Sequence, residues 1–122
     1  MKKYFATLFL LILIPMNMAY AHTTKRIAEF SNAQVAVWKT VIYPNSKQRL
    51  AMHRHEYNRV MVALSDGVLK ITNDKGKTHY MKLEKNKAYY LTKDIPNELH
   101  MDENITRHPI SVMVIELKEN QK

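Results

Sequence analysis

The dominant pattern along this chain is the short alternation of apolar and polar residues that β-strands produce. In 57–64, for example, Val60, Val62 and Leu64 share one face of a predicted strand, because side chains two apart point the same way. No segment shows a long helical stripe of period 3.6. Strands are predicted over 34–43, 57–64, 68–72, 77–83, 88–92, 99–101 and 110–117.

Turn residues separate these predicted strands at intervals of roughly ten residues. Ser65-Asp66-Gly67 and Asn73-Asp74-Lys75-Gly76 are typical hairpin connections, and Lys85-Asn86-Lys87 makes another. Asn86 tolerates the left-handed backbone conformation that such a turn requires. Short strands with regular turns predict an all-β sandwich or barrel.

The N-terminal segment has a different character from the rest. Lys2 and Lys3 precede an apolar run over 4–14, and Ala19-Tyr20-Ala21 offers the small residues of a cleavage site. This layout is typical of a secretory signal peptide, and the run is short for a membrane span. We therefore expect a signal peptide over 1–21 and a single domain over 22–122, periplasmic or secreted, with no membrane attachment after cleavage.

Composition narrows the chemistry available to this domain. The chain has 122 residues and no cysteine, which excludes zinc–thiolate sites and cysteine nucleophiles. Its net charge is +8, but the cations are scattered along the sequence without a dense basic run. We therefore expect a solvated basic surface and no nucleic-acid partner.

The candidate chemistry centres on three histidines. His53 and His55 lie two residues apart in a run with strand character, so both rings are predicted on one face. His100 follows the turn-like Asp94-Ile95-Pro96-Asn97. A pair and a distant third histidine are typical of a metal site assembled on a β-barrel. Three imidazoles with open positions suit a divalent ion such as Zn, Fe, Mn, Ni or Cu.

These residues resemble the motifs of the cupin superfamily across about 35–117. His53, His55 and Gly67 match its first motif, whereas Pro96, His100 and Asn104 match its second. The resemblance implies a small double-stranded β-helix, a jelly-roll-like barrel, with a divalent metal on His53, His55 and His100. It leaves two functions open, which are binding of a small ligand and metal-dependent catalysis of the oxygenase or isomerase type.

One departure from the first motif affects the predicted site. The metal-binding glutamate of the family would fall at Arg59 or Val60, and neither is a carboxylate. A guanidinium beside a divalent ion repels it unless an anion lies between them. We therefore predict a ligand site of Arg59, His53, His55 and His100 for a small, anionic molecule. The alternative for Arg59 is a salt bridge to Glu56 or another acid.

Two further expectations concern the ends and faces of the domain. The predicted strand 110–117 is apolar on both faces, so we expect a homodimer that covers the outer one. Cleavage after Ala21 would make His22 the mature N-terminus, where its amine and ring could chelate copper. Exported copper binding through His22 is the third functional alternative.

Overall fold

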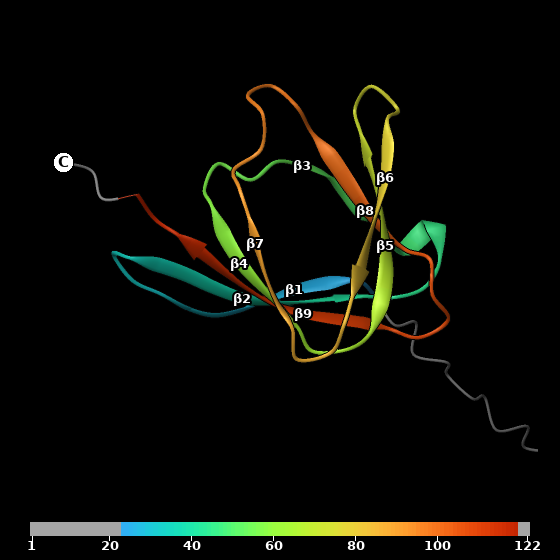
Figure 1. Ribbon diagram of the computed structural model, residues 1–122, viewed down its shortest axis with the longest axis horizontal. Helices are drawn as coiled ribbons and strands as arrows, with labels where there is room; N and C mark the ends of the chain where they lie inside the picture. The colour runs from blue at the N-terminus through green and yellow to red at the C-terminus, as the bar shows by residue number, and fades with distance from the viewer. Residues whose placement is uncertain (1–22, 120–122) are drawn as a thin grey trace, which may run out of the picture.

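The computed structural model describes residues 23–119 and shows an all-β molecule (Figure 1). The predicted signal peptide and His22 lie outside the described residues. Among the residues described, no helix has the length and apolar character needed to cross a membrane. The elements are β1 (Lys25–Ser31), β2 (Val35–Ile42), the 3-10 turn η1 (Ser46–Gln48), β3 (Leu50–His53), β4 (Arg59–Ala63), β5 (Gly67–Asn73), β6 (Thr78–Leu83), β7 (Ala88–Leu91), β8 (His100–Asn104) and β9 (Ile110–Leu117).

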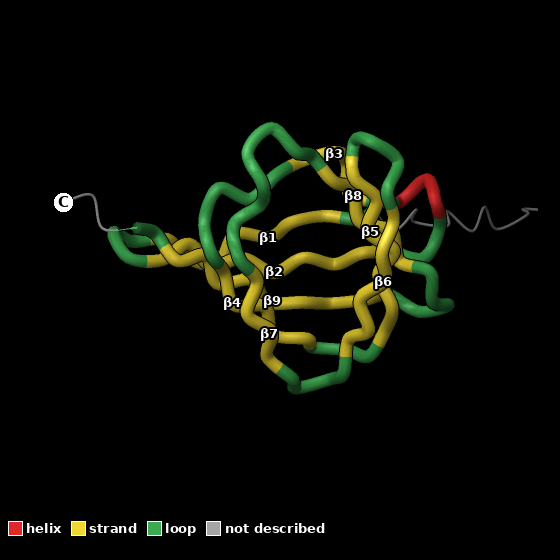
Figure 2. Tube along the Cα trace, turned by 45° about the horizontal axis from the view of Figure 1, so that its top comes forward, coloured by secondary structure: helices red, strands yellow, loops and turns green. Residues whose placement is uncertain are grey.

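The strands form two antiparallel sheets. One sheet has five strands in the order β1-β2-β9-β4-β7, and the other has four in the order β3-β8-β5-β6. Figure 2 shows β1, β2 and β9 side by side in one wall, with β5, β6 and β8 in another. The chain passes between the two sheets several times. The crossings after β3 and after β7 are the ones that position the candidate site.

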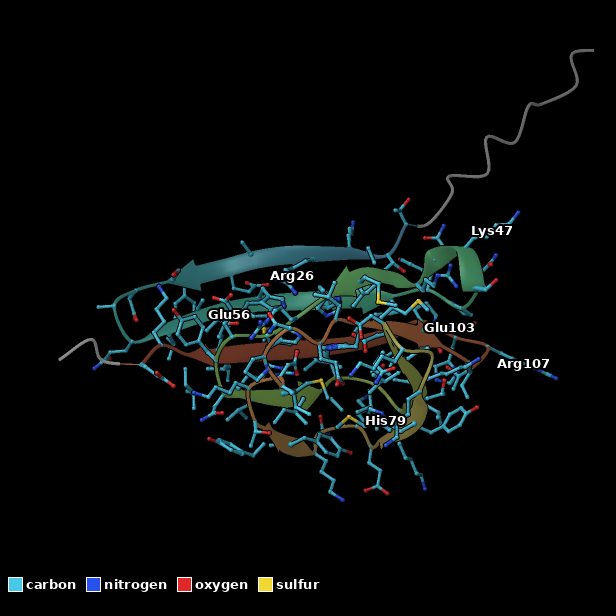
Figure 3. All side chains as sticks on the ribbon, turned by 90° about the horizontal axis from the view of Figure 1, so that it is seen from above. Arg26, Lys47, Glu56, His79, Glu103 and Arg107 are labelled. Atoms are coloured by element: carbon cyan, nitrogen blue, oxygen red, sulfur yellow. The ribbon has the colours of Figure 1, made fainter. Side chains whose placement is uncertain are left out.

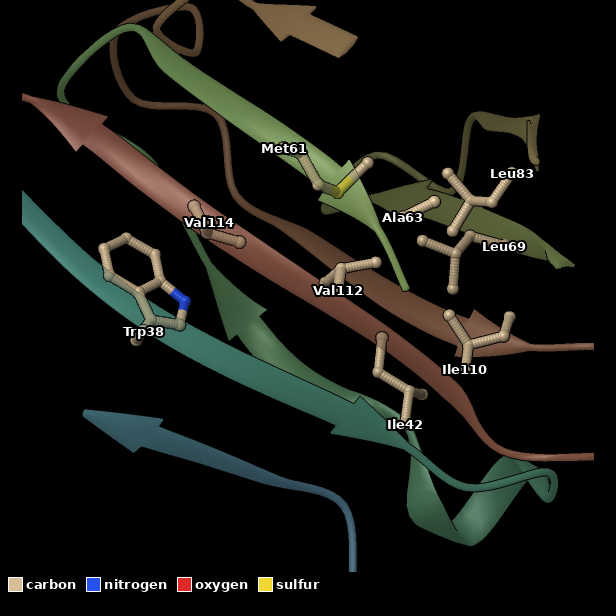
Figure 4. Close-up of a cluster of buried hydrophobic side chains, with 9 residues drawn as sticks. All are labelled: Trp38, Ile42, Met61, Ala63, Leu69, Leu83, Ile110, Val112 and Val114. Carbon is tan, nitrogen blue, oxygen red and sulfur yellow. The ribbon is translucent and has the colours of Figure 1, made fainter. Parts of the chain in front are cut away.

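The core fills the space between the sheets (Figure 4). Strand β4 shows how the alternation works, because Arg59, Met61 and Ala63 point inward while Val60 and Val62 are only partly buried. Ile42, Leu83 and Ile110 are the largest fully buried side chains. The cluster comprises Trp38, Ile42, Met61, Ala63, Leu69, Leu83, Ile110, Val112 and Val114.

The turns behave as their residues predict. Asn86 and Gly76 both have positive φ, at 67° and 81°, in the tight connections where the sequence places them. Asn104 is 2% exposed, and its amide donates to the carbonyls of Ile42 and His108 at 2.9 and 2.8 Å. This last residue of the cupin-like second motif therefore fastens the turn after β8 to the end of β2.

Strand β1 is a departure from the prediction. It pairs with β2 at the sheet edge, and all seven of its residues are exposed. Its pattern is broken by a register shift between Ala28 and Phe30, so the sequence shows no clean alternation there. Strand β8 also differs, because it covers His100–Asn104 and not the predicted 99–101.

Candidate metal centre

His53 and His100 are held beside each other by strand pairing. His53 is the last residue of β3, and its Cα partner on β8 is His100. The ring centroids are 4.5 Å apart. His53 Nδ1 lies 2.6 Å from the carbonyl oxygen of Ala51, and a carbonyl only accepts, so Nδ1 carries the hydrogen. The lone pair of the neutral ring is then on Nε2.

His55 reaches the same point from a loop. The prediction that it shares a strand face with His53 is wrong in detail, because β3 ends at His53 and β4 begins at Arg59 in the other sheet. The loop is fixed by Asp94, whose Oδ2 accepts the His55 N–H at 2.6 Å. The Asp94 N–H in turn donates to the His55 carbonyl at 2.9 Å.

The structure brings all three predicted histidines together. One ring nitrogen from each of His53, His55 and His100 lies within 4.8 Å of the others. The His55 ring centroid is 5.0 Å from that of His53 and 5.5 Å from that of His100. Zn–N bonds are about 2.0–2.1 Å long, so the three nitrogens would have to move to about 3.0–3.4 Å from one another to share one ion. The three-histidine cluster could therefore hold a metal ion.

Two carboxylates that were not predicted as site residues, Asp94 and Asp102, lie beside the histidine cluster. Asp94 Oδ2 lies 3.3 Å from His100 Nδ1, on the outer side of that ring. Asp102 Oδ2 lies 3.6 Å from His53 Nε2 and 3.9 Å from His100 Nε2. The spacing in the sequence could have predicted Asp102, because it lies two residues beyond His100 on β8 and therefore on the same face of the strand.

Burial and neighbouring cations favour the neutral rings of His55 and His100. Burial, reinforced by the Arg59 guanidinium, lowers the pKa of His55 to about 3. Burial also lowers the pKa of His100, against the attraction of Asp102. Burial raises the pKa of Asp102, although His100 and His53 oppose the shift. The neutral imidazole is the form that binds a metal ion, so the His55 and His100 rings are in the metal-binding form.

Arg59 lies at the cluster, but its guanidinium has protein partners. Its side chain is 9% exposed, with Nη2 3.8 Å from Asp94 Oδ1. Its Nη1 donates to the Thr92 carbonyl at 3.1 Å. The predicted alternative of a salt bridge therefore occurs with Asp94 and not with Glu56. Because a guanidinium has five N–H donors, this arrangement leaves donors for a ligand.

The cluster lies between two cavities. His100 and Arg59 line an open cavity of about 510 Å³, with Lys77, His79 and Lys93 also in its wall. His53, His55 and Asp102 line an inner cavity of about 70 Å³, which is mostly apolar. His79 is an exposed residue of β6 (Figure 3). Trp38 belongs to the buried core, and the guanidinium of Arg26 on β1 lies 4.3 Å from the centre of its ring.

Comparison with solved structures identifies the fold. A cupin domain from Bordetella pertussis Tohama I superposes with a TM-score of 0.69 at 20% identity, covering 80% of this chain and 95% of that one. An RmlC-like cupin family protein with a double-stranded β-helix fold from Methanocaldococcus jannaschii gives 0.59 at 14% identity, over 81% and 84%. A cupin superfamily protein from Desulfitobacterium hafniense DCB-2 gives 0.56 at 11%, over 80% and 79%. No family model and no curated protein matches the sequence.

These likenesses define the class of protein. The chain has the cupin fold, in which two antiparallel sheets form a double-stranded β-helix. The predicted fold class is thereby confirmed, and the predicted histidines lie together inside it. At identities of 20% or less the likeness extends to the fold alone, because cupins carry many activities.

Proposed function

We propose that this protein binds a small anionic molecule beside a divalent metal held by His53, His55 and His100. The observation that carries the proposal is the convergence of three ring nitrogens within 4.8 Å. They come from the end of β3 with the loop that follows it and from β8, so the fold assembles them from two segments distant in sequence. Imidazole nitrogens suit Zn, Fe, Ni and Cu, and Mn is accommodated where oxygen ligands join them.

The wall of the larger cavity supports the proposal of an anionic ligand. Arg59, Lys77 and Lys93 bring three cations to it, against the carboxylates of Asp94 and Glu98. Asp94 is paired with Arg59, and Lys93 is paired with Glu119 at 3.5 Å, so Lys77 and the remaining N–H donors of Arg59 are the groups that would hold a negative guest. Apolar and aromatic side chains also line this cavity, namely Ile71, Met81, Tyr90 and Leu91. We therefore expect the ligand to be an organic acid with some apolar surface.

Metal analysis of untagged protein tests the first half of the proposal. Wild-type protein should retain or take up about one equivalent of metal, because a three-imidazole site binds divalent ions. His55→Ala should lose it, since the substitution removes one of the three donors. His79→Ala is the matched control, because this ring lines the cavity but is outside the cluster. Wild-type protein that takes up no metal would overturn the proposal.

Anion titration tests the second half. Acetate and inorganic phosphate should perturb the visible spectrum of Co²⁺-loaded protein, and Lys77→Gln should weaken that response while leaving metal content unchanged. Lys77 is exposed, so its replacement should not disturb folding. Arg59→Ala should also leave the metal bound and weaken the anion, because Arg59 has no lone pair to offer a cation. Equal anion affinity in all three proteins would refute the anionic ligand.

The opening of the cluster toward the larger cavity also supports a second candidate, a metal-dependent enzyme. A metal with ligand positions facing a cavity can polarise a bound substrate or activate water. Turnover of small organic acids by metal-loaded protein, absent from His55→Ala, would favour this function over binding alone.

A further inference from the structure

We infer that Asp102 is a fourth ligand, which makes the site a three-histidine, one-aspartate metal centre. This inference rests on the proposed function, because it concerns the same ion. It adds an anionic oxygen donor from β8, whereas the positions on β4 that match the family's glutamate, Arg59 and Val60, carry no carboxylate.

The first step is the orientation of the two paired imidazoles. His53 Nδ1 donates to the Ala51 carbonyl at 2.6 Å, which leaves the Nε2 lone pair directed away from the backbone. His100 Nδ1 faces Asp94 Oδ2 at 3.3 Å, which favours the same tautomer. Such an outer acceptor is the usual partner of a metal-binding imidazole. Both rings therefore present Nε2 to the inner side.

The second step concerns a carboxylate oxygen of Asp102 that lies close to both Nε2 lone pairs. Asp102 Oδ2 lies 3.6 Å from His53 Nε2 and 3.9 Å from His100 Nε2. All three atoms are acceptors in these forms, and acceptors repel at close range unless a positive charge lies between them. The space bounded by His53, His100 and Asp102 is therefore arranged for a cation.

The third step is the environment of the carboxylate. Asp102 is 14% exposed, and its Cα partners on the two adjacent strands are Leu50 and Ile71, both apolar. A buried carboxylate is costly unless it is paired with a cation or coordinates a metal. Among the described residues, its recorded ion-pair partners are the two histidines alone, so a bound ion would compensate its burial.

The fourth step compares these spacings with metal coordination. Bonds of about 2.1 Å at tetrahedral or octahedral angles place neighbouring ligand atoms about 3.0–3.4 Å apart. The distances from Asp102 Oδ2 to His53 and His100 exceed this range by a few tenths of an ångström, and Asp102 is outside the set of atoms that lie within 4.8 Å of one another, so the carboxylate has to move toward the three rings when the ion binds. Asp94 cannot serve in the same way, because it lies at Nδ1 of His100, on the opposite side of the ring.

Variants at three carboxylates separate a ligand from an outer partner. Asp102→Asn should lower the affinity for Zn²⁺ by more than about 100-fold and change the visible spectrum of the Co²⁺ form. Asp94→Asn should cost only about 10–100-fold, the range for outer partners, and keep the spectrum. Glu103→Gln is the matched control, because Glu103 is the adjacent residue of β8 and successive side chains of a strand point to opposite faces. Asp102→Asn with wild-type affinity and spectrum would overturn the inference.

A second measurement uses the wild-type chain and avoids the risk that a variant misfolds. Anomalous diffraction from crystals of Zn²⁺-loaded protein should place the ion about 2.0–2.2 Å from Asp102 Oδ2. An ion on the three histidines, with Asp102 beyond 3 Å, would refute the fourth ligand while leaving the proposed function intact. A wild-type protein that binds no zinc would overturn both.

Discussion

At the scale of single residues, the neutral ring of His55 links metal binding to stability. Burial and Arg59 lower its pKa to about 3 in the folded protein, from an ordinary value of 6.5. Below pH 6.5 the unfolded chain therefore gains a proton that the folded protein cannot take up, and folding stability falls as the pH falls toward 3. The stabilising contribution is fully present only above pH 6.5.

A His55→Gln variant should lack this contribution. Relative to the variant, metal-free wild-type protein should lose about 1–2 kcal/mol between pH 7 and pH 5, a figure reduced for the partial exposure of the ring. Urea unfolding in the presence of a chelator measures the difference at each pH. Parallel curves for the two proteins would show that His55 titrates alike in the folded and unfolded states.

At the scale of elements, the close contact between β5 and β9 depends on Gly67. A Cβ at this position would lie 2.5 Å from Cδ1 of Ile110, whose side chain is fully buried. Gly67→Ala should therefore destabilise the protein by about 1–3 kcal/mol through overpacking. In an Ile110→Ala background the same substitution should cost much less, because the clashing atoms are gone. Additive effects on the unfolding free energy would refute this explanation.

The elements also show what a sequence can specify. The strands with a buried face were predicted, because one face repeats apolar residues with a period of two. Strand β1 was missed because all seven residues are exposed and its register shifts. The three histidines could be singled out by their spacing. The placement of His55 in a loop and the approach of Asp94 and Asp102 depend on contacts between segments distant in sequence, and no local pattern records them.

At the scale of the whole molecule, the outer face of the five-stranded sheet lacks a covering layer among the described residues. Partly exposed apolar side chains follow β9 and its neighbours, at Val41, Val60, Val62, Met113, Ile115 and Leu117. Phe30 on the edge strand β1 is 58% exposed and pairs with Val37 on β2. We propose that a second copy of the chain covers this face, since Lys39 is the one charged residue that β2, β4 and β9 place on it.

Light scattering at micromolar concentration should give about twice the chain mass for wild-type protein. Phe30→Glu should shift it toward monomer, because a carboxylate would be buried in the apolar contact. Tyr80→Glu is the matched control, since Tyr80 is 63% exposed but lies on β6 of the other sheet. Monomeric wild-type protein would contradict the proposed dimer.

Export is a separate prediction for the whole chain. The sequence pattern at the N-terminus predicts cleavage after Ala21 and a mature product that begins at His22. Intact-mass measurement of exported protein should lack residues 1–21. Recovery of uncleaved chain in the membrane fraction would contradict it.

The reciprocal hydrogen bonds between His55 and Asp94 determine how the two segments that carry these residues can open. They tie the segment between β3 and β4 to the segment between β7 and β8, and Asn58 adds a bond from the Lys93 N–H at 2.8 Å. Neither segment can swing outward alone without breaking bonds that the other shares. Amide hydrogens in both should therefore exchange with solvent as one cooperative unit, at a rate that a bound metal would slow.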